Sequence, residues 1–318
     1  MKNILYFFWY FLLFFCSSIA AKNIHYEHCQ KGDVQSLREV AEAINRNFSA
    51  QIAKLDHNEL TSDDRGKHYN LLFEKCIVNN FSLNDLKKLH VEQLQQIFSL
   101  IDSVIFYAKN PAVIPMYTKV LNEKKTRGED IDHAIINLFR NYTLLRLDKE
   151  ALALKSAYPT LLKEKSVTTI KRSKSPGKKL LYFPENQDIL IEKAFQLPQG
   201  KHIVVINSLK CNGSKNFIQW VSAKPEMLAF FKNHSTWIMH QSRNLDVQAL
   251  KDFNKTHPEI YSYHINSESD WPEIPFWGTP TFYLFDKGKM IKQLIGWPPE
   301  GKEQQLQELI AYFNPHQK

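Results

Sequence analysis

The hydrophobic pattern of the chain changes at residues 163–179, and this change separates two parts with different secondary structure. Before the segment, apolar residues such as Val34, Leu37, Val40 and Ile44 recur at three- and four-residue spacing, the period of an amphipathic helix. After it, short apolar runs of strand type alternate with helical segments. At 318 residues the chain is long enough for two domains with separate cores. We therefore predict an α + α/β architecture, with an all-α domain first and a mixed-sheet α/β domain second.

The N-terminal part reads as one helix after another, and we predict a helical domain over residues 22–162. Residues 138–159, "LFRNYTLLRLDKEALALKSAYP", resemble a tetratricopeptide-type helical hairpin, with the small residues Ala151, Ala153 and Ala157 where helices would approach closely. No second clean copy follows at a fixed period. An irregular bundle and a short solenoid therefore both stay open.

Residues 163–179, "KEKSVTTIKRSKSPGKK", are basic, rich in serine and broken by a Pro-Gly pair. This composition predicts a solvated, flexible linker between the two domains.

Residues 180–318 carry the strand signals. Two short runs around a turn at residues 185–187 predict a strand–turn–strand start, and "KHIVVINSL" is typical of a buried parallel strand. A helix is predicted from Asn212 to Asn233, bent or broken near Pro225. The whole order is βαβαβ, then a β-hairpin, then a closing helix. It predicts a mixed sheet with helices on both faces.

The first 21 residues have the anatomy of a cleaved signal peptide: an early lysine, an apolar run from Ile4 to Cys16, and small residues at Ala20 and Ala21. A retained anchor is the alternative, but the run is shorter than the roughly 18 to 20 residues that span a bilayer. We predict that residues 1–21 are removed and that the protein is periplasmic or secreted.

The formal net charge of +8 makes the surface basic without a recognisable nucleic-acid motif. The chain has only 10 glycines, and none forms a phosphate-binding GxGxxG pattern. We predict no nucleic-acid partner and no cofactor, and we expect a protein substrate or protein partner.

Three cysteines remain after signal cleavage. In an oxidising compartment Cys29 and Cys76 are natural disulfide partners, which leaves Cys211 as a free thiol. A metal site at His25, His28 and Cys29 is the alternative, but no second ligand cluster at zinc-site spacing follows. We therefore predict the disulfide and no metal.

Cys211 stands just after the buried strand and opens a helix, where unsatisfied N–H groups and the helix dipole favour a thiolate. Lys210 and Lys215 add positive charge nearby. Far downstream, Thr279 and Pro280 precede the strand "TFYLF". The order of elements, the cysteine and "GTPTFYLFDKG" together resemble the thioredoxin fold over residues 180–315, and the strand–turn–strand start looks like the TlpA and peroxiredoxin-like branch.

The resemblance implies a cis-proline at Pro280 beside the reactive sulfur, in a loop whose backbone pairs with an extended substrate. Trp277, just before this loop, would line a peptide groove, although packing of the loop onto the sheet explains it equally well. The chain departs from the family at Ser214, where a resolving cysteine is usual, and at Val205, where a buried acid is usual.

This CxxS pattern predicts monothiol chemistry, either disulfide exchange or isomerisation, with Cys211 as nucleophile and Ser214 as a hydrogen-bond donor to the thiolate. One alternative is a redox-inactive protein whose helical domain recognises a protein partner and whose second domain is a scaffold. A lesser alternative is peroxiredoxin-like peroxide reduction. It would place Ser208 in the hydroxyl position of the motif, but Val204 stands where that motif begins with proline.

Overall fold

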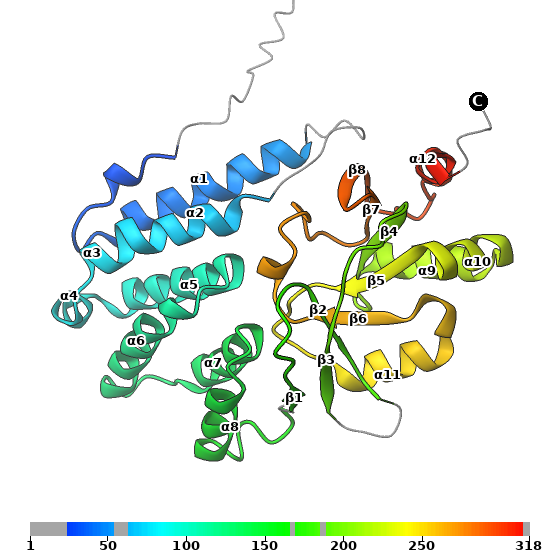
Figure 1. Cartoon of the computed structure of the whole chain (residues 1–318). Helices are drawn as coiled ribbons and strands as arrows, with labels where there is room; N and C mark the ends of the chain where they lie inside the picture. The colour runs from blue at the N-terminus through cyan, green and yellow to red at the C-terminus, as the bar shows by residue number, and fades with distance from the viewer. Residues whose placement is uncertain (1–23, 54–62, 166–168, 185–188, 314–318) are drawn as a thin grey trace, which may run out of the picture.

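The computed structural model describes residues 24–53, 63–165, 169–184 and 189–313, which form a helical half followed by a half built around one sheet (Figure 1). We call residues 24–165 the helical half and residues 169–313 the sheet half. The signal peptide predicted at residues 1–21 lies outside the described residues. In the described part of the chain, no helix combines the length and apolar character needed to cross a membrane.

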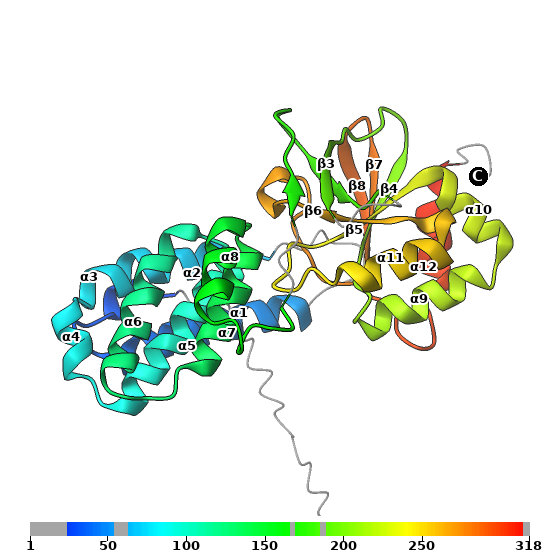
Figure 2. The same cartoon turned by 90° about the horizontal axis from the view of Figure 1, so that it is seen from below.

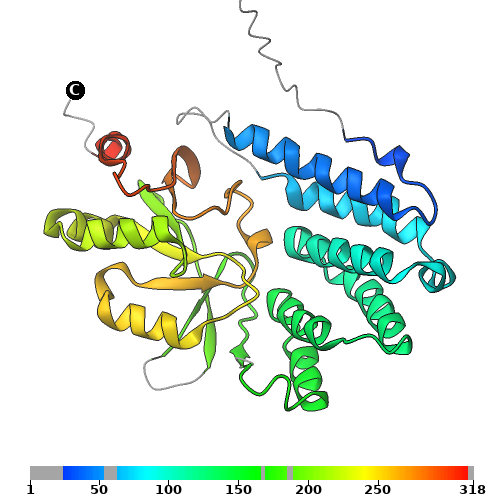
Figure 3. The ribbon, with the colours of Figure 1, turned by 180° about the vertical axis from the view of Figure 1, so that it is seen from behind.

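The helical half contains eight α-helices in its described ranges, and the predicted all-α character of this half is confirmed. Figures 1 and 3 show them stacking on one another in chain order, from α1 and α2 at one end to α7 and α8 at the other. Their bounds are α1 Val34–Ala53, α2 Arg65–Leu72, α3 Val78–Asn80, α4 Leu83–Lys88, α5 Val91–Ala108, α6 Ile114–Thr126, α7 Asp132–Leu144 and α8 Asp148–Ala157, with a π-helical turn Phe73–Ile77 between α2 and α3.

Local sequence signals explain where several helices begin and end. Ser82 caps α4: its side chain accepts from the Asp85 N–H while the Asp85 carboxylate accepts from the Ser82 N–H. α5 ends at Lys109, whose φ of 50° is left-handed. α7 and α8 are separated at Arg146 (φ 58°), within the predicted helical hairpin of residues 138–159. Whether this pair belongs to the tetratricopeptide class stays a prediction.

A single cluster of buried apolar side chains runs from Val34 to Leu162 and forms the core of the helical half. The predicted disulfide joins Cys29 to Cys76 at the edge of this core and is present in the structure. It closes a loop between residues 47 positions apart in sequence. By loop-closure entropy such a crosslink stabilises a fold by about 4 kcal/mol.

The sheet half is built on one eight-stranded mixed sheet, so the predicted βαβαβ order, the hairpin and the closing helix are confirmed. The strand order is β1-β3-β2-β6-β5-β4-β7-β8. Neighbours β4, β5 and β6 are parallel, whereas β2–β3 and β7–β8 are antiparallel hairpins. The bounds are β1 Ile170–Lys171, β2 Lys179–Tyr182, β3 Leu190–Ala194, β4 His202–Asn207, β5 Ser235–Met239, β6 Ser262–Ile265, β7 Thr281–Asp286 and β8 Lys289–Ile295.

The predicted arrangement of helices on both faces of the sheet is wrong. Helices α9 Asn212–Ser222, α10 Pro225–His234 and α12 Glu303–Ile310 pack against the face that carries Val205 and Trp237. α11 Val247–Thr256 contacts Met239, which is two residues beyond Trp237 on β5 and so points to the same face. The reason is that successive right-handed crossovers running in one direction put their helices on one side.

The opposite face of the sheet carries Val204, Ile206 and Tyr283, and the loop residues Trp271 and Ile274 cover it. Figures 1 and 3 show the helical half beyond this face, with the sheet between it and α9–α12. In Figure 2 the two halves lie side by side and meet along the ends of α1, α7 and α8.

The segment predicted as a flexible linker is partly built into the sheet. Ile170 and Lys171 form β1, which pairs in parallel with β3, and Ile170 is buried. The side chain of Arg172 forms ion pairs with Asp148 (2.8 Å) and with the buried Glu192 (3.0 Å). The basic side chain of Arg172 in this segment is therefore held in place by the carboxylate of Glu192.

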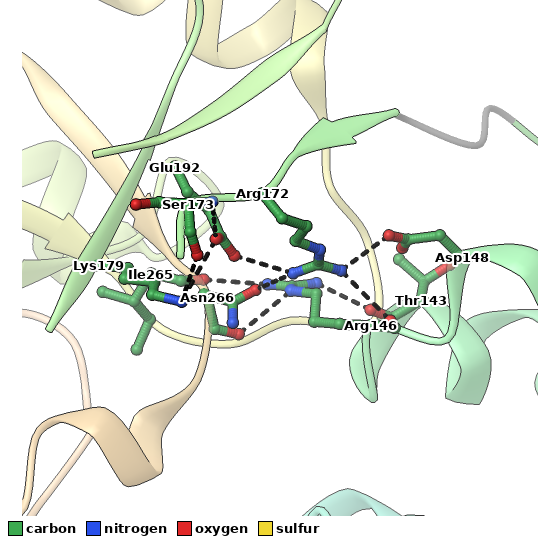
Figure 4. Close-up of polar contacts among 9 residues, drawn as sticks. All are labelled: Thr143, Arg146, Asp148, Arg172, Ser173, Lys179, Glu192, Ile265 and Asn266. Atoms are coloured by element: carbon green, nitrogen blue, oxygen red, sulfur yellow. Dashed lines mark hydrogen bonds and ion pairs between the residues drawn. The ribbon is translucent and has the colours of Figure 1, made fainter. Parts of the chain in front are cut away.

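Polar contacts join the two halves at several points. Figure 4 shows Arg146, at the α7–α8 turn, donating to the carbonyl oxygens of Ile265 and Asn266 at the end of β6, both at 3.2 Å. Arg172 of the sheet half donates to Asp148 of α8 at 2.8 Å and to the Asn266 side chain at 2.6 Å, and so links α8 to the end of β6. Further contacts between the halves are the pairs Arg243–Asp102 (3.0 Å) and Lys109–Glu268 (2.9 Å), and the bond from Gln241 to the Leu144 carbonyl (2.6 Å).

Candidate functional site around Cys211

Cys211 occupies the junction that its sequence position predicts. Strand β4 is buried along its whole length, a short loop of residues 208–210 follows, and Cys211 is the N-cap of α9 with extended backbone angles (φ −86°, ψ 128°). The thiol is partly exposed and is the one free cysteine among the described residues. A nucleophilic sulfur therefore sits at a helix start with access to solvent.

The loop that precedes β7 reaches the sulfur. The Thr279–Pro280 bond is cis, and the Cys211 thiol donates to the Thr279 carbonyl oxygen at 3.1 Å. The Pro280 carbonyl accepts from the Gly296 N–H at 2.7 Å, which ties this loop to the end of β8. Cys211, Thr279 and Pro280, which are far apart in sequence, thus lie together.

Opposing influences act on the pKa of Cys211. Burial raises the pKa of the thiol. Hydrogen bonds from the Thr279 side chain, from the N–H groups of Ser214 and Gly213 and from the Ser214 hydroxyl together outweigh burial and hold the pKa below its ordinary value. The donors at the helix start are the physical cause of a thiolate-prone sulfur.

Ser214 is almost fully buried in the first turn of α9, with 1% of its surface exposed. Its hydroxyl oxygen accepts from the Ser208 N–H at 3.1 Å, so its own hydrogen is available to the sulfur. Ser214 therefore links the loop before Cys211 to the helix after it.

Gly213 and Trp297 belong to the site, although neither was singled out from the sequence. A Cβ atom on Gly213 would lie 2.9 Å from Pro280 Cδ and 3.2 Å from the Trp297 carbonyl oxygen, so only glycine lets α9 approach the proline loop this closely. Trp297 is buried and its ring packs on Phe217 of α9 at 4.9 Å. The glycine beside the cysteine in "KCNGS" was the available signal, whereas Trp297 had none.

The expected contribution of Lys210 is not what the structure shows. Its ammonium group pairs with Asp246 at 3.2 Å, and both side chains are well exposed to solvent. Because the carboxylate draws the lysine toward α11, hydrogen bonds rather than lysine charge account for the lowered pKa of Cys211.

Trp277 lies on the loop before Thr279, partly buried, and packs against the apolar cluster that includes Trp271. Trp271 in turn is fully buried and stacks on Phe195 at 5.3 Å. Both rings hold the loop on the sheet. A role of Trp277 in a peptide groove stays a prediction.

A small cavity of about 80 Å³ opens beside the Cys211 loop, at the carboxyl ends of β4, β5 and β6. Asn207, His240 and His264 line it, and each has a buried nitrogen without a hydrogen-bond partner in the described structure. Burial lowers the pKa of His240 to about 4 and of His264 to about 3. The cavity has room for a few water molecules, with these nitrogens as polar partners.

Comparisons with known proteins leave the family open. No family model matches the chain, and no curated protein matches it. A solved structure described as a thioredoxin-like protein from Bacteroides caccae ATCC 43185 is similar at 12% identity, covering 89% of this chain and 94% of that one, with a TM-score of 0.28. Because so low a score does not establish a common fold, the chemistry of the site rests on the geometry around Cys211.

Proposed function

We propose that this protein is an exported thiol–disulfide exchange protein that acts through Cys211 alone. The observation that carries the proposal is a free, partly exposed thiol at the N-cap of α9, held beside Thr279 of the cis-proline loop, with its pKa lowered by surrounding hydrogen bonds. The Cys29–Cys76 disulfide supports an oxidising compartment, where substrates with disulfides occur.

The reaction conserves electrons and needs no external oxidant. The Cys211 thiolate attacks one sulfur of a substrate disulfide, an S–S bond forms between them, and the other substrate sulfur leaves as a thiolate. A second thiolate of the substrate then attacks the substrate sulfur of this mixed disulfide. The new substrate disulfide forms and Cys211 leaves as a thiolate, so the net change is isomerisation.

Ser214 fits this single-cysteine cycle. It supplies a hydrogen bond to the Cys211 thiolate, both before attack and when Cys211 is the leaving group. It cannot attack the mixed disulfide, so resolution falls to the substrate. The backbone at Thr279 and Pro280, with Trp277 nearby, would receive an extended segment of the substrate protein.

The alternatives rest on less. In the peroxiredoxin-like alternative Ser208 would act near the sulfur, but its N–H is bound to Ser214 and its hydroxyl accepts from the Lys210 N–H. The redox-inactive alternative, a binding or scaffold protein, requires an unreactive Cys211. The reactivity of that thiol therefore decides between thiol–disulfide exchange and the redox-inactive protein.

The test is the pH dependence of iodoacetamide labelling of the mature protein, followed by mass spectrometry, with Cys211→Ser as the blank. We expect a labelling midpoint below the ordinary cysteine value of about 8.5, because hydrogen bonds favour the thiolate. A midpoint at or above that value would overturn the proposal and leave the binding protein.

An activity assay follows from the same proposal. The wild-type protein should restore the native pairing of a substrate with scrambled disulfides, and Cys211→Ser should not. In Ser214→Cys the new thiol should attack the mixed disulfide at Cys211 and release the substrate. The substrate adduct on Cys211 should therefore be shorter-lived in this variant than in the wild type.

A further inference from the structure

The loop before β7, which places Thr279 beside Cys211, also contacts the helical half through Pro275 and Phe276. In the loop, a Cβ atom on Gly278 would lie 2.2 Å from the ring of Phe276, so this ring lies directly on the backbone next to Thr279. The Phe276 carbonyl accepts from the Tyr283 hydroxyl, which fixes the residue to β7. The position of Phe276 therefore determines the path of the chain that reaches the sulfur.

The helical half contacts this loop in two ways. The Asp63 N–H donates to the Pro275 carbonyl oxygen at 2.8 Å, and the ring of Phe48 near the end of α1 stacks on Phe276 with centroids 6.5 Å apart. Figures 1 and 3 show the end of α1 turned toward the segment before β7.

Arg65 holds the two contacts together. Its guanidinium group lies 3.5 Å over the Phe48 ring and 4.6 Å from the Tyr107 ring, and it makes a two-point pair with Asp63 (2.8 and 2.5 Å). These ion-pair side chains are about four-fifths buried. Partial removal from water strengthens such a cation–aromatic stack, so Arg65 stabilises the position of the Phe48 ring.

The rest of the boundary keeps the helical half in a fixed position for this contact. Arg146 and Arg172 join it to the end of β6 and to β3 at the far end of the boundary (Figure 4). These contacts fix the helical half to the sheet half, so the end of α1 is held against the proline loop.

We infer that Phe48 and Asp63 are positioning residues for Cys211, and that the helical half sets the reactivity of the thiol through Phe276 and Thr279. This inference rests on the proposed function. It gives the helical half a task at the reaction site: it holds the proline loop where the Thr279 side chain can donate to the Cys211 thiolate. A partner that displaced α1 from Phe276 would lower the reactivity of Cys211.

The experiment compares the labelling midpoint of Cys211 in the full mature protein with that in Phe48→Ala. We expect the midpoint to rise by about half a pH unit, which leaves about threefold less thiolate at pH 7. Phe48→Tyr keeps the stacked ring and should return the wild-type midpoint. The midpoint reports on the surroundings of the Cys211 sulfur, and the control variant separates this effect from a general loss of packing.

Phe230→Ala is the matched control. Phe230 lies in the sheet half on α10 and packs on the rings of Phe231, His234 and Phe313, so its loss removes aromatic contacts away from the proline loop. It should leave the midpoint unchanged. If Phe48→Ala does not fold, Arg65→Met, which frees the Phe48 ring from its cation, should raise the midpoint in the same direction.

The outcomes separate the two proposals. An ordinary midpoint in the wild-type protein overturns both of them. A lowered wild-type midpoint that is unchanged in folded Phe48→Ala and in Arg65→Met overturns the positioning role alone, and the proposed chemistry of Cys211 stands.

Discussion

At the scale of single residues, Ser214 serves two partners at once. Its oxygen accepts from the Ser208 N–H, and its hydroxyl donates to the Cys211 sulfur.

Ser214→Ala should raise the labelling midpoint of Cys211 by about half a pH unit, which leaves about threefold less thiolate at pH 7. It should also cost about 1–2 kcal/mol of unfolding free energy, because the Ser208 N–H loses its acceptor. Thiol titration and urea unfolding measure the two effects. Ser222→Ala, at the exposed end of α9, is the control, and equal midpoints in both variants would exclude the role of Ser214.

The sequence predicted where Cys211 and the Thr279–Pro280 loop lie better than it predicted the residues packed around them. Cys211 and Thr279–Pro280 were found because each follows or precedes a strand with a clear apolar pattern. Trp297 was not, since its approach to Gly213 depends on how β8 returns beside β7. The partner of Lys210 was also beyond the sequence, because Asp246 is brought near only by the crossover from β5 to α11.

At the scale of strands and helices, His264 makes β6 sensitive to acid. Burial, followed by the positive charges of Arg146 and His240, lowers the pKa of His264 to about 3, from an ordinary value of 6.5. Between these two pH values His264 is protonated in the unfolded chain and neutral in the folded chain. Stability is therefore present above about pH 6.5 and is lost as the pH falls toward 3.

The prediction concerns the slope of this loss. Each such histidine contributes about 1.4 kcal/mol of unfolding free energy per pH unit. In urea unfolding at pH 6, 5 and 4, His264→Leu should lose about 1 kcal/mol less per pH unit than the wild type. His133→Gln replaces an exposed histidine on α7 and should keep the wild-type slope. Parallel slopes for wild type and His264→Leu would show that His264 is already protonated in the folded protein.

The same scale shows where pattern reading succeeds and where it stops. The hairpins, the break before Pro225 and the split between α7 and α8 were predicted because proline and apolar period are local signals. The role of β1 was missed, because Ile170 stands alone among polar residues and gains its partner only from β3. The face on which α11 packs was likewise set by crossover handedness rather than by its own sequence.

At the scale of the whole molecule, we predict that Arg146 couples the unfolding of the two halves. Its guanidinium group donates to Thr143 of its own half and to Ile265 and Asn266 of the other (Figure 4). Burial lowers the pKa of Arg146 to about 10, so the group is still charged at neutral pH. Because the charged guanidinium group donates to three carbonyl oxygens here, neither lysine nor methionine can replace it.

Arg146→Met should lower the free energy of unfolding by about 2–4 kcal/mol and uncouple the halves. Trp9 is in the predicted signal peptide and the other tryptophans are all in residues 180–318, so tryptophan fluorescence of the mature protein follows the sheet half, whereas far-UV circular dichroism is dominated by the helices. The two urea transitions should coincide in the wild type, as in a single cooperative unit, and separate in Arg146→Met. Arg140→Met, on the neighbouring helix α7, should leave them coincident. Separate transitions in the wild type, or coincident ones in Arg146→Met, would mean that the boundary does not depend on this residue.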